Sequence, residues 1–294
     1  MSDRMAVPKT YKLYIGGSFP RSESGRSYVV SSPGGQFLAN AAQASRKDAR
    51  DAVVAARRSF AGWSIATAYN RGQVLYRVAE LMEGRRSQFA DEVAAAEGIS
   101  LAEAASVVGA AIDRWVWYAG WSDKIAQVLG GTNPVAGPYF DFSIPDPTGV
   151  VAILAPQESS LLGLVSVLAP VIVTGCTAVV VASEARPLPA VTLSEVVATS
   201  DVPGGVVNIL TGRTHELAPV LAAHMDVNAI DLTGASDDAL VALERAAADN
   251  IKRTFRLASD GAGKGGDGGW SGDPGLDRIR AVLETKTVWH PIGI

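Results

Sequence analysis

Short apolar, β-branched runs alternate with segments of helix length through the second half of the chain. The runs lie at residues 150–154, 177–181, 206–210, 229–232 and 253–257, and the helical segments at 161–173, 189–199, 215–223 and 239–251. Continuous apolar runs of this length are typical of strands buried on both faces of a parallel sheet. The alternation therefore predicts an α/β fold with a doubly wound, Rossmann-like, mostly parallel sheet.

The first half of the chain is mainly helical in pattern. Ser45 is followed three residues later by Asp48, which predicts a capped helix that stops near residue 62. Helical spacing continues through residues 71–97, with a possible break at Gly84-Arg85, and through 101–125. Residues 11–19 and 28–30 read instead as extended segments next to glycine turns.

An aromatic cluster marks the 101–125 segment: Trp115, Trp117, Tyr118 and Trp121. Aromatic rings at this spacing could stack on a nucleotide, but they favour packing in the core of a helical layer.

Two segments fall outside the alternating pattern. Residues 139–144 alternate between polar and apolar between two prolines, which suits an edge strand or an exposed arm spanning 137–147. After a glycine-rich stretch, 258–275, the tail 276–294 has a short helical piece and then an extended segment at 285–292, with no covalent neighbour to pair with. We expect a domain at 1–257, a flexible linker at 258–275 and a docking tail at 276–294.

Composition narrows the class of protein. The chain has 294 residues, 48% of them hydrophobic, and a formal net charge of -4, so nucleic acid is an unexpected partner. It has one cysteine, and no part of it reads as a signal peptide or membrane span. The expected compartment is the cytoplasm.

Candidate chemistry is sparse. In a doubly wound sheet, ligands bind at the carboxyl ends of the strands, so the loops to search are 156–160, 183–186, 211–213 and 233–236. Glu158 and Glu184 lie in two of these loops and could act as a base or as ribose ligands, although solvated loop carboxylates are commoner. Cys176 enters its strand at the amino end and reads as a small buried hydrophobe. The three histidines are too scattered to suggest a metal cluster.

Several phrases together resemble one family across roughly residues 11–257. They lie at residues 13–17, 48–63, 118–124, 147–151, 183–184, 201–212 and 233–234. The family is the NAD(P)-dependent aldehyde dehydrogenases, in their amino-terminal cofactor-binding half. Within it, the chain resembles the truncated second module of two-module members. The resemblance also implies that residues 284–291 are a strand that pairs with a neighbouring subunit, and that 139–144 is an oligomerisation arm.

The family's catalytic set does not carry over by this resemblance. The positions of its Trp-Asn step, which stabilises the oxyanion, hold Gln157 and Glu158, and a carboxylate would repel an oxyanion. The position of its general base holds Arg256, which cannot accept a proton. The segment that carries the nucleophilic cysteine has no counterpart, and Cys176 aligns elsewhere. The resemblance therefore implies no catalytic residues and a missing catalytic domain.

The resemblance implies a reduced cofactor site as well. The lysine that holds the adenosine ribose is Val181 here, the serine that meets the pyrophosphate is Ala235, and Ala239 replaces a glycine. Losing the first two contacts costs about 2 to 5 kcal/mol of NAD affinity. The remaining matches are Ser183, Glu184, Gly212, Thr233 and Gly234, so NAD or NADP is expected to bind weakly or not at all.

Two functional hypotheses follow. The first is a catalytically inactive aldehyde dehydrogenase homologue that serves as a structural or regulatory subunit, joined to a full-length aldehyde dehydrogenase or to itself. Its expected interface residues are Tyr139, Phe140, Phe142, Val288, Trp289 and His290. The alternative is an NAD(P)-dependent oxidoreductase subunit whose catalytic residues come from a partner chain. A self-assembling homo-oligomer without an enzymatic partner is a weaker third possibility.

Overall fold

A five-stranded parallel sheet forms the centre of the molecule. The computed structural model describes residues 9–257 and 269–293. The sheet runs in the order β7-β6-β5-β8-β9. Its strands are β5 (Val150–Leu154), β6 (Thr177–Val181), β7 (Val207–Leu210), β8 (Ala229–Asp231) and β9 (Arg253–Phe255). Every residue of the first four of these strands is buried, which confirms the predicted fold class.

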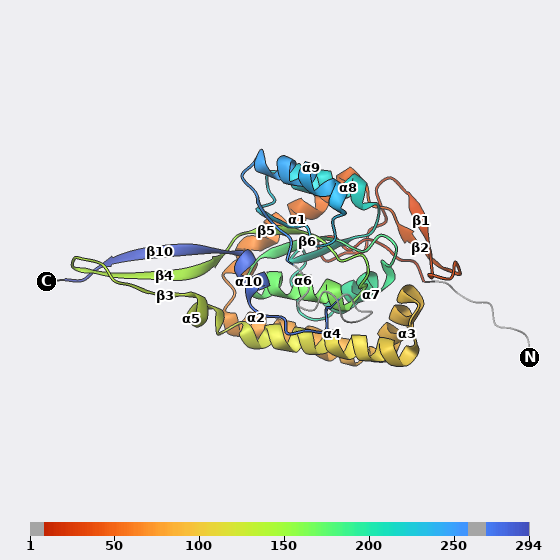
Figure 1. Ribbon diagram of the computed structural model, residues 1–294, viewed down its shortest axis with the longest axis horizontal. Helices are drawn as coiled ribbons and strands as arrows, with labels where there is room; N and C mark the ends of the chain where they lie inside the picture. Colours follow the sequence, from red (N-terminus) through yellow and green to blue (C-terminus); the bar gives the residue numbers. More distant parts are fainter. Residues whose placement is uncertain (1–8, 258–268, 294) are drawn as a thin grey trace, which may run out of the picture.

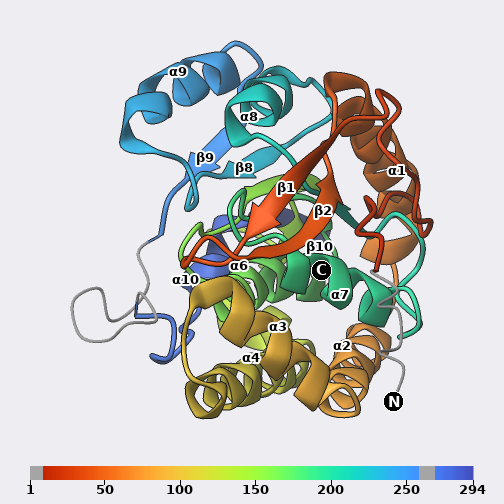
Figure 2. The same cartoon turned by 90° about the vertical axis from the view of Figure 1, so that its right-hand side faces the viewer.

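Helices cover both faces of this sheet (Figures 1 and 2). They are α6 (Leu162–Val173), α7 (Leu188–Val197), α8 (Thr214–Ala223) and α9 (Asp237–Ala248). Alternate residues of a strand point to opposite faces. Val151 and Ile153 accordingly pack in the core with α6 and α7, whereas Ala152 packs in a second core with α8 and α9.

The helical first half packs around this unit. It contains α1 (Arg46–Ser64), α2 (Ala68–Glu83), α3 (Arg86–Glu97), α4 (Leu101–Trp121) and α5 (Ile125–Leu129). The predicted capping box is present: Ser45 Oγ accepts from the Asp48 amide, and Asp48 Oδ2 accepts from the Ser45 amide. The possible break at Gly84-Arg85 is the boundary between α2 and α3. Trp115 and Tyr118 are fully buried, so the aromatic cluster belongs to the core.

Of the two extended segments predicted near the amino terminus, one is a strand in the structure and the other is not. A hairpin of β1 (Ser27–Ser31) and β2 (Phe37–Ala42) includes the predicted segment at 28–30. Residues 11–19 form isolated bridges instead of a strand, so that prediction is wrong. The cause is the tight turn at Gly16 and Gly17, both with positive φ, which leaves only short contacts such as that between Tyr14 and Ile209.

A three-stranded antiparallel arm extends away from this body (Figure 1). Its order is β10-β4-β3, from β10 (Leu283–Pro291), β4 (Tyr139–Pro147) and β3 (Gly131–Asn133). Of the two predictions for 139–144, the arm is confirmed, whereas the edge strand is wrong because β4 is the central strand. The tail segment was expected to have no sequence neighbour to pair with and to dock elsewhere, and it does so: β10 pairs with the distant β4 from Leu283↔Pro147 to Pro291↔Tyr139. The alternation of polar and apolar residues at 139–144 and the two flanking prolines give no information about a partner strand as distant in sequence as β10.

The segment before β10 is packed against the body. Residues 258–268 of the predicted linker lie outside the described residues, but Trp270 is only 4% exposed, so the prediction of a flexible linker does not hold there. The short helix α10 (Asp277–Ala281) follows and contacts α6. Within residues 9–257 and 269–293, no single helix has the length and hydropathy to cross a membrane. Only α3 and α4 taken together pass that test, and they meet at a bend of 117°.

Candidate functional site

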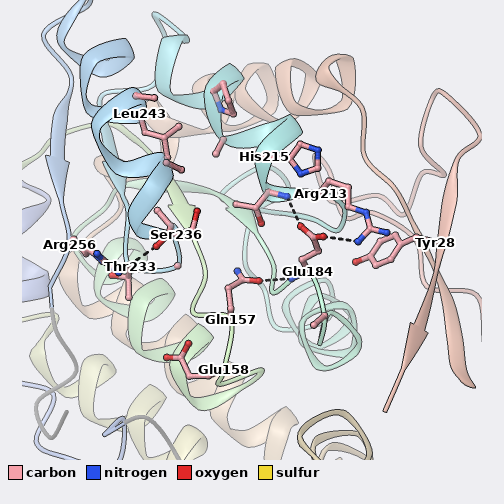
Figure 3. Close-up of a pocket in the computed structure, with 18 of the residues that line it drawn as sticks. Tyr28, Gln157, Glu158, Glu184, Arg213, His215, Thr233, Ser236, Leu243 and Arg256 are labelled. Carbon is pink, nitrogen blue, oxygen red and sulfur yellow. Dashed lines mark hydrogen bonds and ion pairs between the residues drawn. The ribbon is translucent and has the colours of Figure 1, made fainter. Parts of the chain in front are cut away.

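The loops selected from the sequence meet in one cleft at the carboxyl edge of the sheet. Its volume is about 850 Å³. Gln157 and Glu158 line it from the loop after β5, Glu184 from the loop after β6, and Thr233 and Gly234 from the loop after β8 (Figure 3). The loops selected for search therefore lie together in the structure. Strand β1 of the amino-terminal hairpin and the helices α8 and α9 complete the walls of the cleft.

Glu184 is fully engaged with residues of the chain. Its Oε1 lies 2.6 Å from Arg213 Nη1, and its Oε2 accepts the Thr214 amide at 3.0 Å, the first residue of α8. The Arg213 guanidinium also lies over the Tyr28 ring, 5.0 Å from its centroid. Burial raises the pKa of the Tyr28 hydroxyl, so this ring is a neutral wall of the cleft.

Gln157 joins two of the loops. Its side-chain oxygen accepts from the Glu184 amide at 2.9 Å, and its side-chain nitrogen donates to the Ala155 carbonyl. Ser183 Oγ donates to the Gln157 carbonyl at 2.9 Å. Ser183 is buried and does not line the cleft. It therefore fixes the loop and has no direct access to a ligand.

The two glycines among the predicted site residues have structural reasons to be glycine. Gly212 has φ +147°, and a Cβ there would lie 3.1 Å from the Ala44 amide nitrogen. At Gly234 a Cβ would lie 1.9 Å from the Ala155 carbonyl oxygen, which no side chain can tolerate. Gly234 lines the cleft, whereas Gly212 lies behind it. Neither glycine is evidence for a bound cofactor.

Thr233 is oriented by a buried ion pair beneath the cleft. Its amide donates to Asp231 Oδ1 at 2.9 Å, and Asp231 Oδ2 lies 3.3 Å from Arg278 Nη1. Burial raises the pKa of the Asp231 carboxyl, and the Arg278 guanidinium opposes that shift. Arg278 comes from α10, so the segment before the arm is tied to the floor of the cleft.

The positions that the family resemblance assigns to catalysis are held by charges with internal partners. The Glu158 carboxylate accepts from Trp270 Nε1 at 3.2 Å. The Arg256 guanidinium lies 2.7 Å from Asp237 Oδ1. An arginine cannot act as a base at neutral pH, so the position of the family's general base holds no base here.

Cys176 lies away from the cleft, as expected from its place before β6. It is fully buried, and its thiol donates to the Val282 carbonyl with Sγ 3.4 Å from the oxygen. Burial raises the pKa of this thiol, which disfavours the thiolate. Among the described residues, no three His, Cys, Asp or Glu side chains are grouped closely enough to hold a metal ion.

Sequence reasoning missed four residues that shape this region: Tyr28, Arg213, Trp270 and Arg278. Tyr28 belongs to a hairpin far from the sheet in sequence, Trp270 lies within the glycine-rich stretch, and Arg278 follows it. No local pattern connects them to the cleft. Arg213 lay inside a loop selected for search. Its positive charge could have suggested an ion pair with Glu184, which lies in another of these loops.

Comparison with known proteins identifies the family. The family model described as "Aldehyde dehydrogenase family" matches residues 19–259. Retinal dehydrogenase 2 of Gallus gallus is 33% identical over 250 residues, which cover 83% of this chain and 48% of that protein. The chain thus spans about half the length of the curated relatives it matches.

Solved structures agree with this match. PnpE from Pseudomonas sp. WBC-3 is 28% identical with a TM-score of 0.80, over 86% of this chain and 52% of that one. Betaine aldehyde dehydrogenase from Staphylococcus aureus, solved with NAD+, shares the fold at 24% identity and a TM-score of 0.79, over 83% of this chain and 49% of that one. The sequence match and the sheet topology lead to one conclusion: the chain belongs to the aldehyde dehydrogenase family.

Proposed function

We propose that this chain is a catalytically inactive aldehyde dehydrogenase homologue that acts as a structural or regulatory subunit of an aldehyde dehydrogenase assembly. The observation that carries the proposal is Glu158. A carboxylate stands where the family resemblance expects an oxyanion donor, and Trp270 holds it in place. A negative charge at that position raises the energy of a developing oxyanion instead of lowering it.

Arg256 supports the same proposal. Its guanidinium stands at the position of the general base and is paired with Asp237. Cys176, the only cysteine of the chain, is buried at the opposite end of β6 and cannot reach the cleft. Both observations support a loss of the family's catalytic residues at these positions.

The arm supports a role in assembly. Tyr139, Phe140 and Trp289 are 43%, 46% and 58% exposed on it, so large aromatic side chains face solvent. Phe142 and Val288 are half-buried in the same sheet, and His290 is exposed. Exposed aromatic surface of this kind marks a protein–protein contact. We propose that the arm binds a complete aldehyde dehydrogenase subunit or a second copy of this chain.

An aldehyde oxidation assay tests the proposed lack of catalytic activity. The purified chain, with NAD+ or NADP+ and a panel of aliphatic and aromatic aldehydes, is expected to produce no reduced cofactor above a no-protein blank. Turnover that is lost in Cys176→Ala would overturn the proposal, because it would make the buried thiol the nucleophile.

A second candidate is an NAD(P)-dependent oxidoreductase subunit with catalytic residues supplied by a partner. The preserved cleft of about 850 Å³ favours it. This function requires the cleft to hold a dinucleotide, so micromolar NAD+ binding by calorimetry would support it and the absence of binding would remove it.

A further inference from the structure

A short segment near the amino terminus, residues 9–15, ties two parts of the fold together, and we call it the strap. The Tyr11 carbonyl accepts a hydrogen bond from the Ala42 amide of β2 at 2.9 Å. Tyr14 exchanges two backbone hydrogen bonds with Ile209 of β7, at 2.9 and 2.8 Å. Because β7 is an edge strand of the central sheet, the strap holds the β1–β2 hairpin against that edge.

Lys9, at the start of the strap, is bound by side chains of two helices. Its ammonium lies 2.9 Å from Glu195 Oε1 and donates to Thr192 Oγ1 at 2.8 Å, and both of these residues belong to α7. The same ammonium lies 3.8 Å from Glu92 Oε1 on α3 and 4.8 Å from the centroid of the Tyr11 ring. One cation therefore faces two carboxylates that come from different helices.

Glu195 is the better paired of the two carboxylates. Besides Lys9 it has a second cation, since Arg85 Nη2 lies 2.5 Å from Glu195 Oε2. Burial acts to raise the pKa of the Glu195 carboxyl, but hydrogen bonds from Arg85 and Lys9 hold that pKa below its usual value. Glu195 is therefore ionised at every pH at which the strap is expected to work.

Glu92 has the opposite balance. Only 13% of its side chain is exposed. Its Oε1 accepts from the hydroxyls of Thr192 and Tyr11, at 2.9 and 3.4 Å, whereas its Oε2 is buried and has no hydrogen-bond partner among the described residues. Burial raises the pKa of the Glu92 carboxyl, and the Thr192 hydroxyl and the Lys9 ammonium oppose that shift only in part.

The groups that face Glu92 come from three elements. The strap contributes Lys9 and Tyr11, α7 contributes Glu195, and α3 itself contributes the neutral Gln88 amide, which donates to Oε1 at 3.4 Å. Burial, with the Glu92 carboxylate beside it, raises the pKa of the Tyr11 hydroxyl, so this group is neutral near pH 7. Between pH 5 and pH 7.5, Glu92 is thus the group of this cluster whose charge is set to change.

We infer that Lys9, Glu92 and Glu195 form a pH-sensitive clamp on the strap, which closes more tightly when the Glu92 carboxyl takes up a proton and opens more readily when it is ionised. Opening removes Lys9 and Tyr11 from Glu92 and lets water reach its carboxylate, so the closed state binds this proton more strongly than the open state. As pH falls through the raised pKa of Glu92 towards the ordinary value, the closed state takes up the proton first and opening becomes rarer. This inference goes beyond the proposed function and does not depend on it.

Native-state hydrogen exchange of the full chain measures how often the strap opens. The amides of Tyr14 and Ala42 report on it, because both are bonded through the strap. After correction for the intrinsic pH dependence of exchange, the opening constant is expected to fall several-fold between pH 7.5 and pH 5. An opening constant that stays the same over this range, or that rises as pH falls, would overturn the inference.

Two variants separate the roles of the carboxylates. Glu92→Gln imitates the protonated acid, so its strap should open as rarely at pH 7.5 as the wild-type strap does at pH 5, without pH dependence. Glu195→Gln removes the closer ion pair of Lys9, so its strap should open more often at every pH and keep the pH dependence. Glu80→Gln, at an exposed ion pair with Arg77 on α2, is the control and should match wild type. A pH dependence that survives in Glu92→Gln, or that disappears in Glu195→Gln, would contradict the inference.

Discussion

The indole nitrogen of Trp270 lies 3.2 Å from Glu158 Oε1 and donates a hydrogen bond to that carboxylate. Arg114 Nη2 holds the Trp270 carbonyl oxygen at 2.7 Å, and the Arg278 guanidinium lies 5.1 Å from the Trp270 ring centroid. The segment that leads into the arm is therefore anchored to the cleft.

Arg278 is expected to stabilise the fold through Asp231. Arg278→Met leaves a buried carboxylate without its cation, which should lower the free energy of unfolding by about 3 kcal/mol at pH 7. Urea unfolding measures the loss. Arg280→Met is the control, because Arg280 is exposed in a surface ion pair with Asp277, and it should change stability by less than about 0.5 kcal/mol.

The loss of unfolding free energy in Arg278→Met should depend on pH. Without Arg278, burial raises the folded pKa of Asp231 further above the unfolded value, opposed only by the hydrogen bonds from Thr233. As pH falls through that folded pKa towards the unfolded one, the folded state takes up the proton first, so the deficit should shrink. A deficit that is constant from pH 7 to pH 4, or no larger than that of the control, would contradict the importance of this pair.

The described part of the chain also contains a buried amine whose titration is measurable. Burial lowers the pKa of Lys252 from 10.5 to about 8. Between these values the unfolded state holds more protons, so stability should rise with pH, by up to about 2 kcal/mol from pH 7.5 to pH 9.5. Lys252→Met should lack this rise, whereas the exposed-lysine control Lys286→Met should keep it. Parallel slopes for all three proteins would refute the prediction.

The reactivity of the Cys176 thiol measures whether this side chain is buried. Its thiol should be unreactive towards a disulfide reagent in the native protein and react completely in urea, since burial disfavours the thiolate. The reaction rate is followed by absorbance. Rapid labelling of the native chain would show that the thiol is accessible and would weaken the inactive-homologue proposal.

The sequence could predict the sheet because its evidence is local. The apolar runs at 150–154 and 177–181 have the length and β-branching of buried parallel strands, and both are strands in the structure. The Ser45–Asp48 capping box works for the same reason, because its two partners are three residues apart. The convergence of the four loops follows from the general geometry of such sheets.

The rest depends on contacts between distant residues. β4 and β10 pair although more than 130 positions separate them in the sequence and they share no motif, and Trp270 reaches Glu158 from 112 positions away. Glu184 was identified, but not its pairing with Arg213 or its role at the start of α8. Such interactions depend on the tertiary fold, which the hydrophobic periodicity of a single segment does not reveal.

Trp289 tests the arm as an interface. Its ring lies 5.7 Å from that of Tyr139, and the side chain is 58% exposed. Trp289→Ser should reduce the oligomer mass measured by light scattering, because it removes apolar contact area while the backbone pairing of β10 with β4 remains. Tyr69→Ser, at an exposed aromatic outside the arm, is the control. Equal masses for wild type and Trp289→Ser would argue against this interface.

Native mass spectrometry of the chain co-expressed with a complete aldehyde dehydrogenase of the same host tests the central claim most directly. The account predicts mixed oligomers that contain both chains and that disappear when residues 285–294 are deleted. The two proteins remaining in separate species, or mixed oligomers persisting in the deletion variant, would contradict it.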